Sequence, residues 1–207
     1  MSDVRIFELG KDSDKARIIA RLHIVVFSGF FLTQLGESFL TTLYQGYIED
    51  DNSGVIVAES IKNKQILGFA AYSKDYSRFY TELKKKHIVK FALCSLGVAI
   101  KHPSFIRRLL GAFKKSNEVR RMEKYVELAS IGVCSNAQGK GIGSQLVDYL
   151  VSMTNFNEYE YISLETDTFN NETANRFYQK RGFEIVRKYT TAEGRIMNEY
   201  RYRQETK

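Results

Sequence analysis

The sequence predicts a single α/β domain built on a mixed β-sheet with helices on both faces. Its 207 residues fit one domain and are enough to bury a sizeable core. Hydrophobic residues make up 43% of the chain and charged residues 27%, which is ordinary globular composition. Strand-like and helix-like segments follow one another without a regular β–α–β repeat. This irregular order predicts a mixed sheet rather than a fully parallel one.

The first third of the chain predicts three strands and two helices. Residues 4–9 alternate as a strand does, and Asp12 or Asp14 could cap a helix that runs to Phe27. The stretch SGFF at 28–31 breaks the helical pattern, and a second helix is expected over 33–47. Residues 54–60 and 65–75 predict two strands joined by a turn. The side chains expected to face the core are Ile18, Ile19, Leu22, Val25, Val26, Leu35, Phe39, Leu40, Leu43, Val55, Val57, Ile66 and Phe69.

One basic segment supplies the whole excess of positive charge. Residues 84–124 hold 12 basic and 2 acidic side chains, a net charge of +10, whereas the whole chain has +7. Helices are expected over 84–100 and 103–115, the second with an apolar stripe from Phe105 to Phe113. A lid, a homodimer contact and a membrane-surface contact are the interpretations of this segment, with a solvated basic face as the simplest alternative. Nucleic acid is not expected, because exposed aromatic residues are not interleaved with the basic ones.

The rest of the chain predicts a glycine-rich loop between a strand and a helix. A strand is expected over 125–133 and a helix from about 141 to 153. The loop between them contains QGKGIGS, whose bare backbone lets an anion approach the first-turn N–H groups of the helix. A tight turn without a ligand is the alternative. A strand over 161–167, a helix over 171–181 and two closing strands, expected to form an antiparallel pair, complete the chain.

Two common phosphate-binding motifs do not fit this loop. A P-loop would need glycine at Cys134 and serine or threonine at Gly141. A dinucleotide fingerprint would need glycine at Ser144, and it would normally open its domain instead of lying two-thirds along the chain.

Two other motifs resemble the GNAT superfamily of acetyltransferases. The first spans the loop, where Val133, Gln138, Gly141 and Gly143 match the acetyl-CoA-binding pattern of that family without a gap. The second follows about thirty residues later as NETANRFYQKRGF, and its matching residues are Asn171, Ala174, Phe177, Tyr178, Gly182 and Phe183. The resemblance is close over about residues 127–187. It implies a GNAT-like mixed, splayed central sheet, with 75–124 as a helical insertion between the third and fourth strands.

The resemblance also implies roles for individual residues. The pantetheine arm of acetyl-CoA would bond near Val133, and its pyrophosphate would lie on the amides from Gln138 to Ser144. Asn171 would contact the cosubstrate, with capping of the following helix as the alternative. Glu127 would be the general base, and Glu165 and His23 are the fallbacks. Tyr178 would protonate the departing thiolate. The full set expected to bind the cosubstrate is Val133, Gln138, Gly139, Lys140, Gly141, Gly143, Ser144 and Asn171.

The expected function is transfer of an acetyl group from acetyl-CoA to an amine of a small molecule. A protein or peptide amine is an alternative acceptor, and a non-catalytic acyl-CoA-binding or regulatory domain is the alternative class. No metal is expected, because the three histidines lack metal-ligand spacing. Two cysteines without a partner pattern and the absence of a signal-peptide pattern predict a cytoplasmic protein.

Overall fold

The computed structural model describes residues 3–11, 14–101, 123–192 and 194–204. These residues form a seven-stranded sheet in the order β1-β2-β3-β4-β5-β7-β6. The strands are β1 (Val4–Glu8), β2 (Ser53–Ser60), β3 (Ile66–Ser73), β4 (Tyr125–Val133), β5 (Tyr161–Asp167), β6 (Glu184–Thr190) and β7 (Ile196–Tyr202). Neighbouring strands are antiparallel except β4 and β5, which are parallel. The predicted mixed sheet is therefore confirmed.

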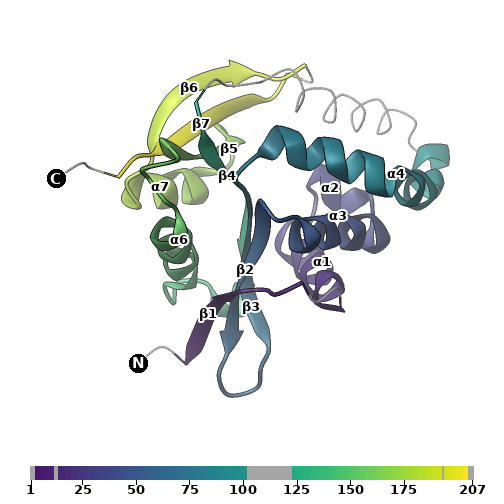
Figure 1. Ribbon diagram of the computed structural model, residues 1–207, viewed down its shortest axis with the longest axis horizontal. Helices are drawn as coiled ribbons and strands as arrows, with labels where there is room; N and C mark the ends of the chain where they lie inside the picture. Colours follow the sequence, from purple (N-terminus) through teal and green to yellow (C-terminus); the bar gives the residue numbers. More distant parts are fainter. Residues whose placement is uncertain (1–2, 12–13, 102–122, 193, 205–207) are drawn as a thin grey trace.

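Helices cover both faces of the sheet (Figure 1). On one face lie α1 (Asp14–Val26), α2 (Phe31–Gln34), α3 (Glu37–Glu49) and α4 (Tyr76–Lys101). On the other lie α6 (Ile142–Met153) and α7 (Glu172–Lys180). Each face has its own apolar core, one centred on Phe39, Leu40 and Phe69, the other on Leu146 and Ile162. The central strands β2 and β3 are buried on both faces, which is why both carry near-continuous apolar sequence.

The buried face of α1 differs from the predicted one. Ile19 and Leu22 are buried as expected, but Ile18 is 49% exposed and Val25 68% exposed. The helix instead turns Ala16, Ala20 and His23 inward. Small alanine side chains let α1 approach α3 closely, so the packed stripe follows the alanines rather than the largest apolar residues.

The predicted second helix is two helices. A short α2 ends at Gln34, and α3 begins after Gly36, whose φ of +88° lies in the left-handed region that favours glycine. The four residues expected to face the core here, Leu35, Phe39, Leu40 and Leu43, are all buried. The break therefore changes the path of the chain but not which side chains form the core.

The basic segment begins with one long helix. α4 starts at Tyr76, eight residues before the predicted start at 84. Asp75 accounts for this, because its carboxylate accepts a hydrogen bond from the Arg78 amide at 3.0 Å and so caps the helix. The predicted helix over 103–115 and its apolar stripe lie outside the described residues.

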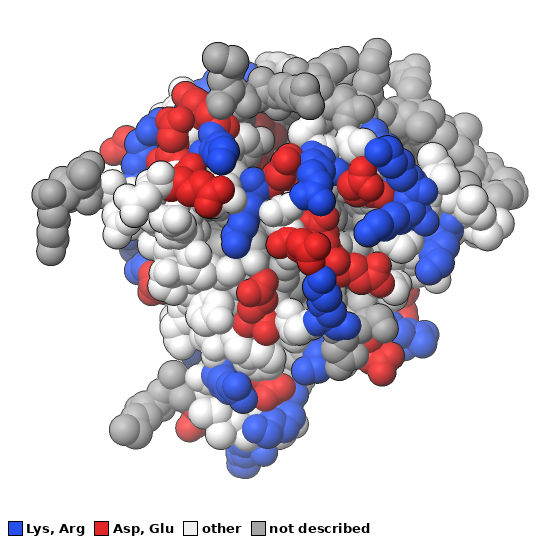
Figure 2. Space-filling view, viewed as in Figure 1, with Lys and Arg blue, Asp and Glu red and all other residues white. Residues whose placement is uncertain are grey.

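No helix in the described ranges is both long enough and apolar enough to cross a bilayer. Acidic and basic side chains are interspersed on the face shown in Figure 2, including over the visible part of α4.

Candidate active site

The sheet opens between β4 and β5. These parallel strands pair only at their first residues, where Tyr125, Val126 and Glu127 face Tyr161, Ile162 and Ser163. Beyond that point β4 stays paired with β3 as far as Val133, whereas β5 stays paired with β7 as far as Asp167. The two strands therefore diverge, and the predicted splayed sheet is confirmed.

A cavity of about 730 Å³ fills this opening. Its α-side wall is aromatic and apolar, formed by His23, Phe27, Phe30, Phe31 and Leu32. Residues 128–131 of β4 and 164–167 of β5 form its floor, and the β6–β7 hairpin contributes residues 189–192. The start of α7 closes the remaining side with Asn171, Ala174 and Tyr178. The cavity can thus hold an apolar group beside polar side chains.

The glycine-rich loop connects the end of β4 to the start of α6. Gly139 has a φ of +73° and Gly141 a φ of +77°, conformations that an L-residue rarely adopts. Gly141 is the N-cap of α6, and no side chain caps the first-turn amides there. A Cβ added at either glycine would meet no atom within 4 Å, so the backbone borders open space. Bare amides at a helix N-terminus fit the pyrophosphate of acetyl-CoA.

The side chains of the loop hold its shape. Gln138 donates from Nε2 to the Val133 carbonyl at 3.1 Å, and Lys140 donates from Nζ to the Asn136 carbonyl at 2.9 Å. Gly143 lies within the first turn of α6, where an added Cβ would meet the Phe177 ring at 3.4 Å. The two sequence motifs therefore contact each other, because Gly143 belongs to the first and Phe177 to the second.

Tyr178 of α7 lies on the wall of the cavity. Its side chain is 8% exposed, lines the cavity, and packs against Phe183 and Tyr200. Burial raises the pKa of its phenol well above the ordinary value, so the hydroxyl is protonated at neutral pH. A protonated phenol at the cavity wall can donate to a leaving thiolate.

Asn171 holds the N-cap position of α7, but its side chain does not cap the helix. Instead its Nδ2 donates to the Thr166 hydroxyl at 2.5 Å, which ties the start of α7 to β5 beside the cavity. The alternative role as a side-chain cap is therefore wrong, and contact with a cosubstrate stays a prediction.

Glu127 lies at the closed end of the opening, at the last position where β4 pairs with β5. Its side chain is buried, but the part of β4 that lines the cavity begins one residue later, at Leu128. Burial, with a smaller contribution from the Glu127 carboxylate, raises the pKa of Tyr47, Tyr76 and Tyr80. Glu127 therefore lies close enough to these three phenols for its charge to act on them.

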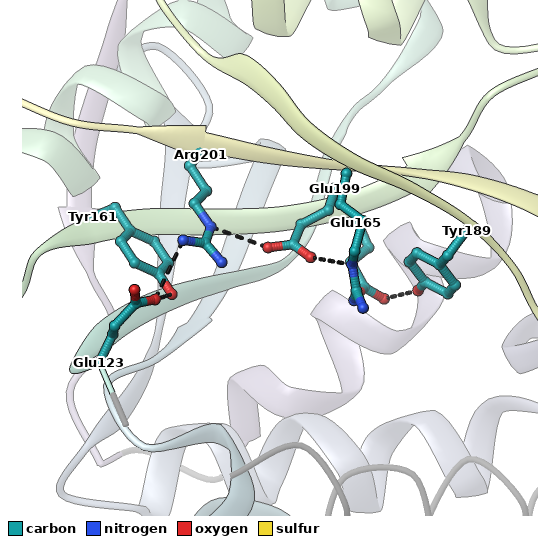
Figure 3. A network of polar contacts seen from close by, with 7 residues as sticks. Glu123, Tyr161, Glu165, Tyr189, Glu199 and Arg201 are labelled. Atoms are coloured by element: carbon teal, nitrogen blue, oxygen red, sulfur yellow. Dashed lines mark hydrogen bonds and ion pairs between the residues drawn. The ribbon is translucent and has the colours of Figure 1, made fainter. Parts of the chain in front are cut away.

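Glu165, the fallback base, does line the cavity, where the Tyr189 hydroxyl donates to its carboxylate. Figure 3 shows this pair beside a chain of contacts along β5, β7 and the residues before β4. In that chain Glu199, 1% exposed, accepts from Arg187 and Arg201 at 3.0 Å each, and Arg201 also reaches Glu123. These ion pairs join β7 to β6 and to a residue before β4, next to the strand that carries Glu165.

Arg195 and Asp167 form a further pair that the sequence analysis did not identify. Arg195 donates to both carboxylate oxygens of Asp167, at 3.0 and 2.6 Å, and both residues line the cavity. This bidentate contact anchors the β6–β7 hairpin to the end of β5. No sequence signal identifies it, because the partners are 28 positions apart and neither belongs to a motif.

Comparisons with known proteins agree with this geometry. The family model described as Acetyltransferase (GNAT) family matches residues 26–183. No curated protein sequence matches the chain. An N-acetyltransferase from Staphylococcus aureus has 16% identity and a TM-score of 0.60, with 98% of this chain and 99% of that one covered.

Two further solved structures have the same fold. NAA60 of Arabidopsis thaliana, solved in complex with acetyl-CoA, has 13% identity and a TM-score of 0.58, covering 97% of this chain and 98% of that one. The ribosomal-protein-S18-alanine N-acetyltransferase of Escherichia coli has 12% identity and a TM-score of 0.59, covering 99% and 96%. At such identities the structures show the fold alone, whereas the family model covers most of the chain. The chain belongs to the GNAT family of acetyltransferases.

Proposed function

We propose that this protein transfers an acetyl group from acetyl-CoA directly to a primary amine of a small molecule. The observation that carries the proposal is the cavity between the diverging strands. Tyr178 lines it, and the bare amides of the glycine-rich loop lie at the end of β4 beyond it. A site that only bound an acyl-CoA would have no need of a protonated phenol at the wall of this cavity.

The proposed cosubstrate is acetyl-CoA, which the match to the acetyltransferase family and a protein of the same fold solved with acetyl-CoA both support. The loop backbone from Gln138 to Ser144 would bind the pyrophosphate, with Gly139 and Gly141 allowing close approach, Gly143 leaving room for the Phe177 ring and Lys140 adding charge. Val133 and Asn171 would border the rest of the molecule. Bound acetyl-CoA supplies a thioester, and the protein must orient the amine, accept its proton and donate a proton to the thiolate. Tyr178 donates, and Glu127 accepts through an intervening group.

A small acceptor is favoured by the walls of the cavity. Phe27, Phe30 and Phe31 lie on one side and Glu165 on the other, so an apolar amine would have its ammonium group near a carboxylate. The competing candidate is a protein or peptide amine. It is suggested by the name of one neighbour of the same fold, the ribosomal-protein-S18-alanine N-acetyltransferase. A cytoplasmic location, a homodimer and a membrane contact through 84–124 stay predictions.

Turnover of acetyl-CoA by the full chain, followed as released thiol over a panel of amines and peptides, tests the proposal. We expect acetylation of small primary amines with an apolar group. Binding of acetyl-CoA without turnover of any amine would indicate the non-catalytic class. Turnover restricted to peptides would contradict the small-molecule acceptor.

A further inference from the structure

His23 is a buried group of the cavity wall that the proposed chemistry does not use. Its side chain is 4% exposed and lines the cavity from α1. Nδ1 lies 2.6 Å from the Tyr44 hydroxyl of α3, and that hydroxyl lies 3.3 Å from the Ser130 hydroxyl of β4. Nε2 is buried and has no hydrogen-bond partner in the described part of the chain. The protein thus supplies a hydrogen-bond partner for Nδ1, whereas the described residues supply none for Nε2.

The contact with Tyr44 indicates which nitrogen carries the proton. An imidazole nitrogen is a stronger base than a phenol oxygen, and a phenol is a stronger acid than a neutral imidazole. The distance of 2.6 Å is also shorter than the usual range for an N–H donor to oxygen. Tyr44 therefore donates to Nδ1, and the Ser130 hydroxyl can donate to the Tyr44 oxygen. His23 then keeps its proton on Nε2.

The surroundings of His23 keep it neutral. Its ring contacts Phe27 from its own helix, Phe69 from β3 and Tyr44 from α3, with ring centroids 4.7, 6.4 and 5.8 Å away. Burial lowers the pKa of His23 to about 4 and raises the pKa of Tyr44, so both groups are uncharged at neutral pH. A neutral Nε2–H group can donate a hydrogen bond, but it cannot take a proton from an amine.

We propose that His23 is a specificity residue whose Nε2–H donates to an uncharged oxygen of the acceptor molecule. The proposal rests on the proposed function, because it requires the acceptor to occupy this cavity. Phe27 and Phe30 lie beside His23, with ring centroids 5.4 Å apart, so the same acceptor carries an apolar group there. The acceptor class is therefore an apolar primary amine that also bears a carbonyl or hydroxyl oxygen. A donor without a partner disfavours acceptors that lack this oxygen.

The position of the proton can be tested without any acceptor. Long-range ¹H–¹⁵N spectra of histidine-labelled protein distinguish a protonated ring nitrogen from an unprotonated one. The signal of His23 is assigned by its loss in His23→Gln. We expect the Nε2–H form at pH 7 and a more mixed population in Tyr44→Phe, in which the donor to Nδ1 is removed. An Nδ1–H form or an imidazolium in the wild type would overturn the proposal whether or not the protein acetylates amines.

A matched pair of acceptors tests the role itself. Phenylalaninol and 1-phenylpropan-2-amine share the ring, the primary amine and the carbon skeleton, but only the first has a hydroxyl oxygen. We expect wild type to prefer phenylalaninol by at least tenfold in kcat/KM, mainly through KM. His23→Leu should remove the preference and His23→Gln, which keeps an N–H donor, should retain part of it. The affinity for acetyl-CoA should not change in either variant.

The matched control is His87→Gln, which changes a buried histidine packed between α3 and α4, away from the cavity. Its preference should equal that of wild type. A preference that survives in His23→Leu would overturn the proposal, as would an equal loss on both acceptors, because the donor would then act on the acetyl group or on the fold. Failure of wild type to acetylate either compound while peptides are acetylated would instead contradict the proposed function.

Discussion

Replacing His23 by glutamine is expected to remove a pH-dependent part of the stability. Burial lowers the pKa of His23 to about 4 from an ordinary value of 6.5. Between these two values the unfolded chain binds a proton at this position more readily than the folded protein does. Stability is therefore complete above about pH 6.5 and is lost as the pH falls towards 4.

The size of the effect follows from the same two values. A shift of about 2.5 units corresponds to about 3 kcal/mol at most, reached below pH 4. At pH 5 the unfolded state is almost fully protonated at this histidine and the folded state hardly at all, which costs wild type about 2 kcal/mol. Glutamine does not titrate, so His23→Gln lacks this loss.

Urea unfolding followed by circular dichroism at pH 7.5 and pH 5.0 measures the free energy of unfolding of both proteins, and so this pH-dependent loss. Carboxylates titrate in both proteins, so their contribution cancels in the difference between wild type and variant. We expect the stability gap between the two proteins to shift by about 2 kcal/mol in favour of His23→Gln at the lower pH. A gap that does not move between the two pH values would refute the reasoning, because it would mean that His23 titrates normally in the folded protein.

Three further predictions concern the loop, the proton donor and the basic segment. Gly141→Asp should weaken acetyl-CoA binding well over tenfold, about 1.4 kcal/mol or more. Gly141→Asn, whose side chain has the same size and also tolerates a positive φ, should lose much less affinity. Equal affinities of the two variants by calorimetry would show that charge is not the cause. Tyr178→Phe should lower kcat and change the free energy of unfolding by about 1 kcal/mol or less, and a large loss of stability at unchanged kcat would make Tyr178 structural. For the segment 84–124 we expect no strong co-sedimentation with anionic vesicles, since the stripe from Phe105 to Phe113 is predicted to pack on protein; salt-sensitive binding would favour a membrane contact.

The sequence predicted those parts of the fold that depend on residues close together in the chain. The strands at 125–133 and 161–167 have the predicted bounds, because each is a short segment rich in aromatic, β-branched and other apolar residues. The antiparallel pairing of the two closing strands was also predicted, and the register of β6 with β7 confirms it. The glycine loop was predictable for a similar reason, since left-handed backbone at Gly139 and Gly141 requires glycine.

Packing between distant segments could not be predicted. Nothing near His23 in the sequence indicates Tyr44, and nothing near Tyr44 indicates Ser130, which is 86 positions further on. The exposed side chains of Ile18 and Val25 have the same origin, because the choice of face on α1 depends on how closely α3 approaches it. Helical periodicity identifies an apolar stripe, but the partner decides which stripe is buried.

The sequence and the structure favour different carboxylates as the general base. Glu127 has the motif position but lies at the closed end of the opening among phenols, whereas Glu165 lines the cavity and accepts from Tyr189. A base need not touch the amine if a water or a phenol passes the proton on. We therefore expect Glu127→Gln to lower kcat by about a hundredfold or more with acetyl-CoA affinity unchanged, and Glu165→Gln, its isosteric control, to affect mainly KM for the amine. The reverse pattern would move the role to Glu165, because its carboxylate lines the cavity and can contact the amine directly.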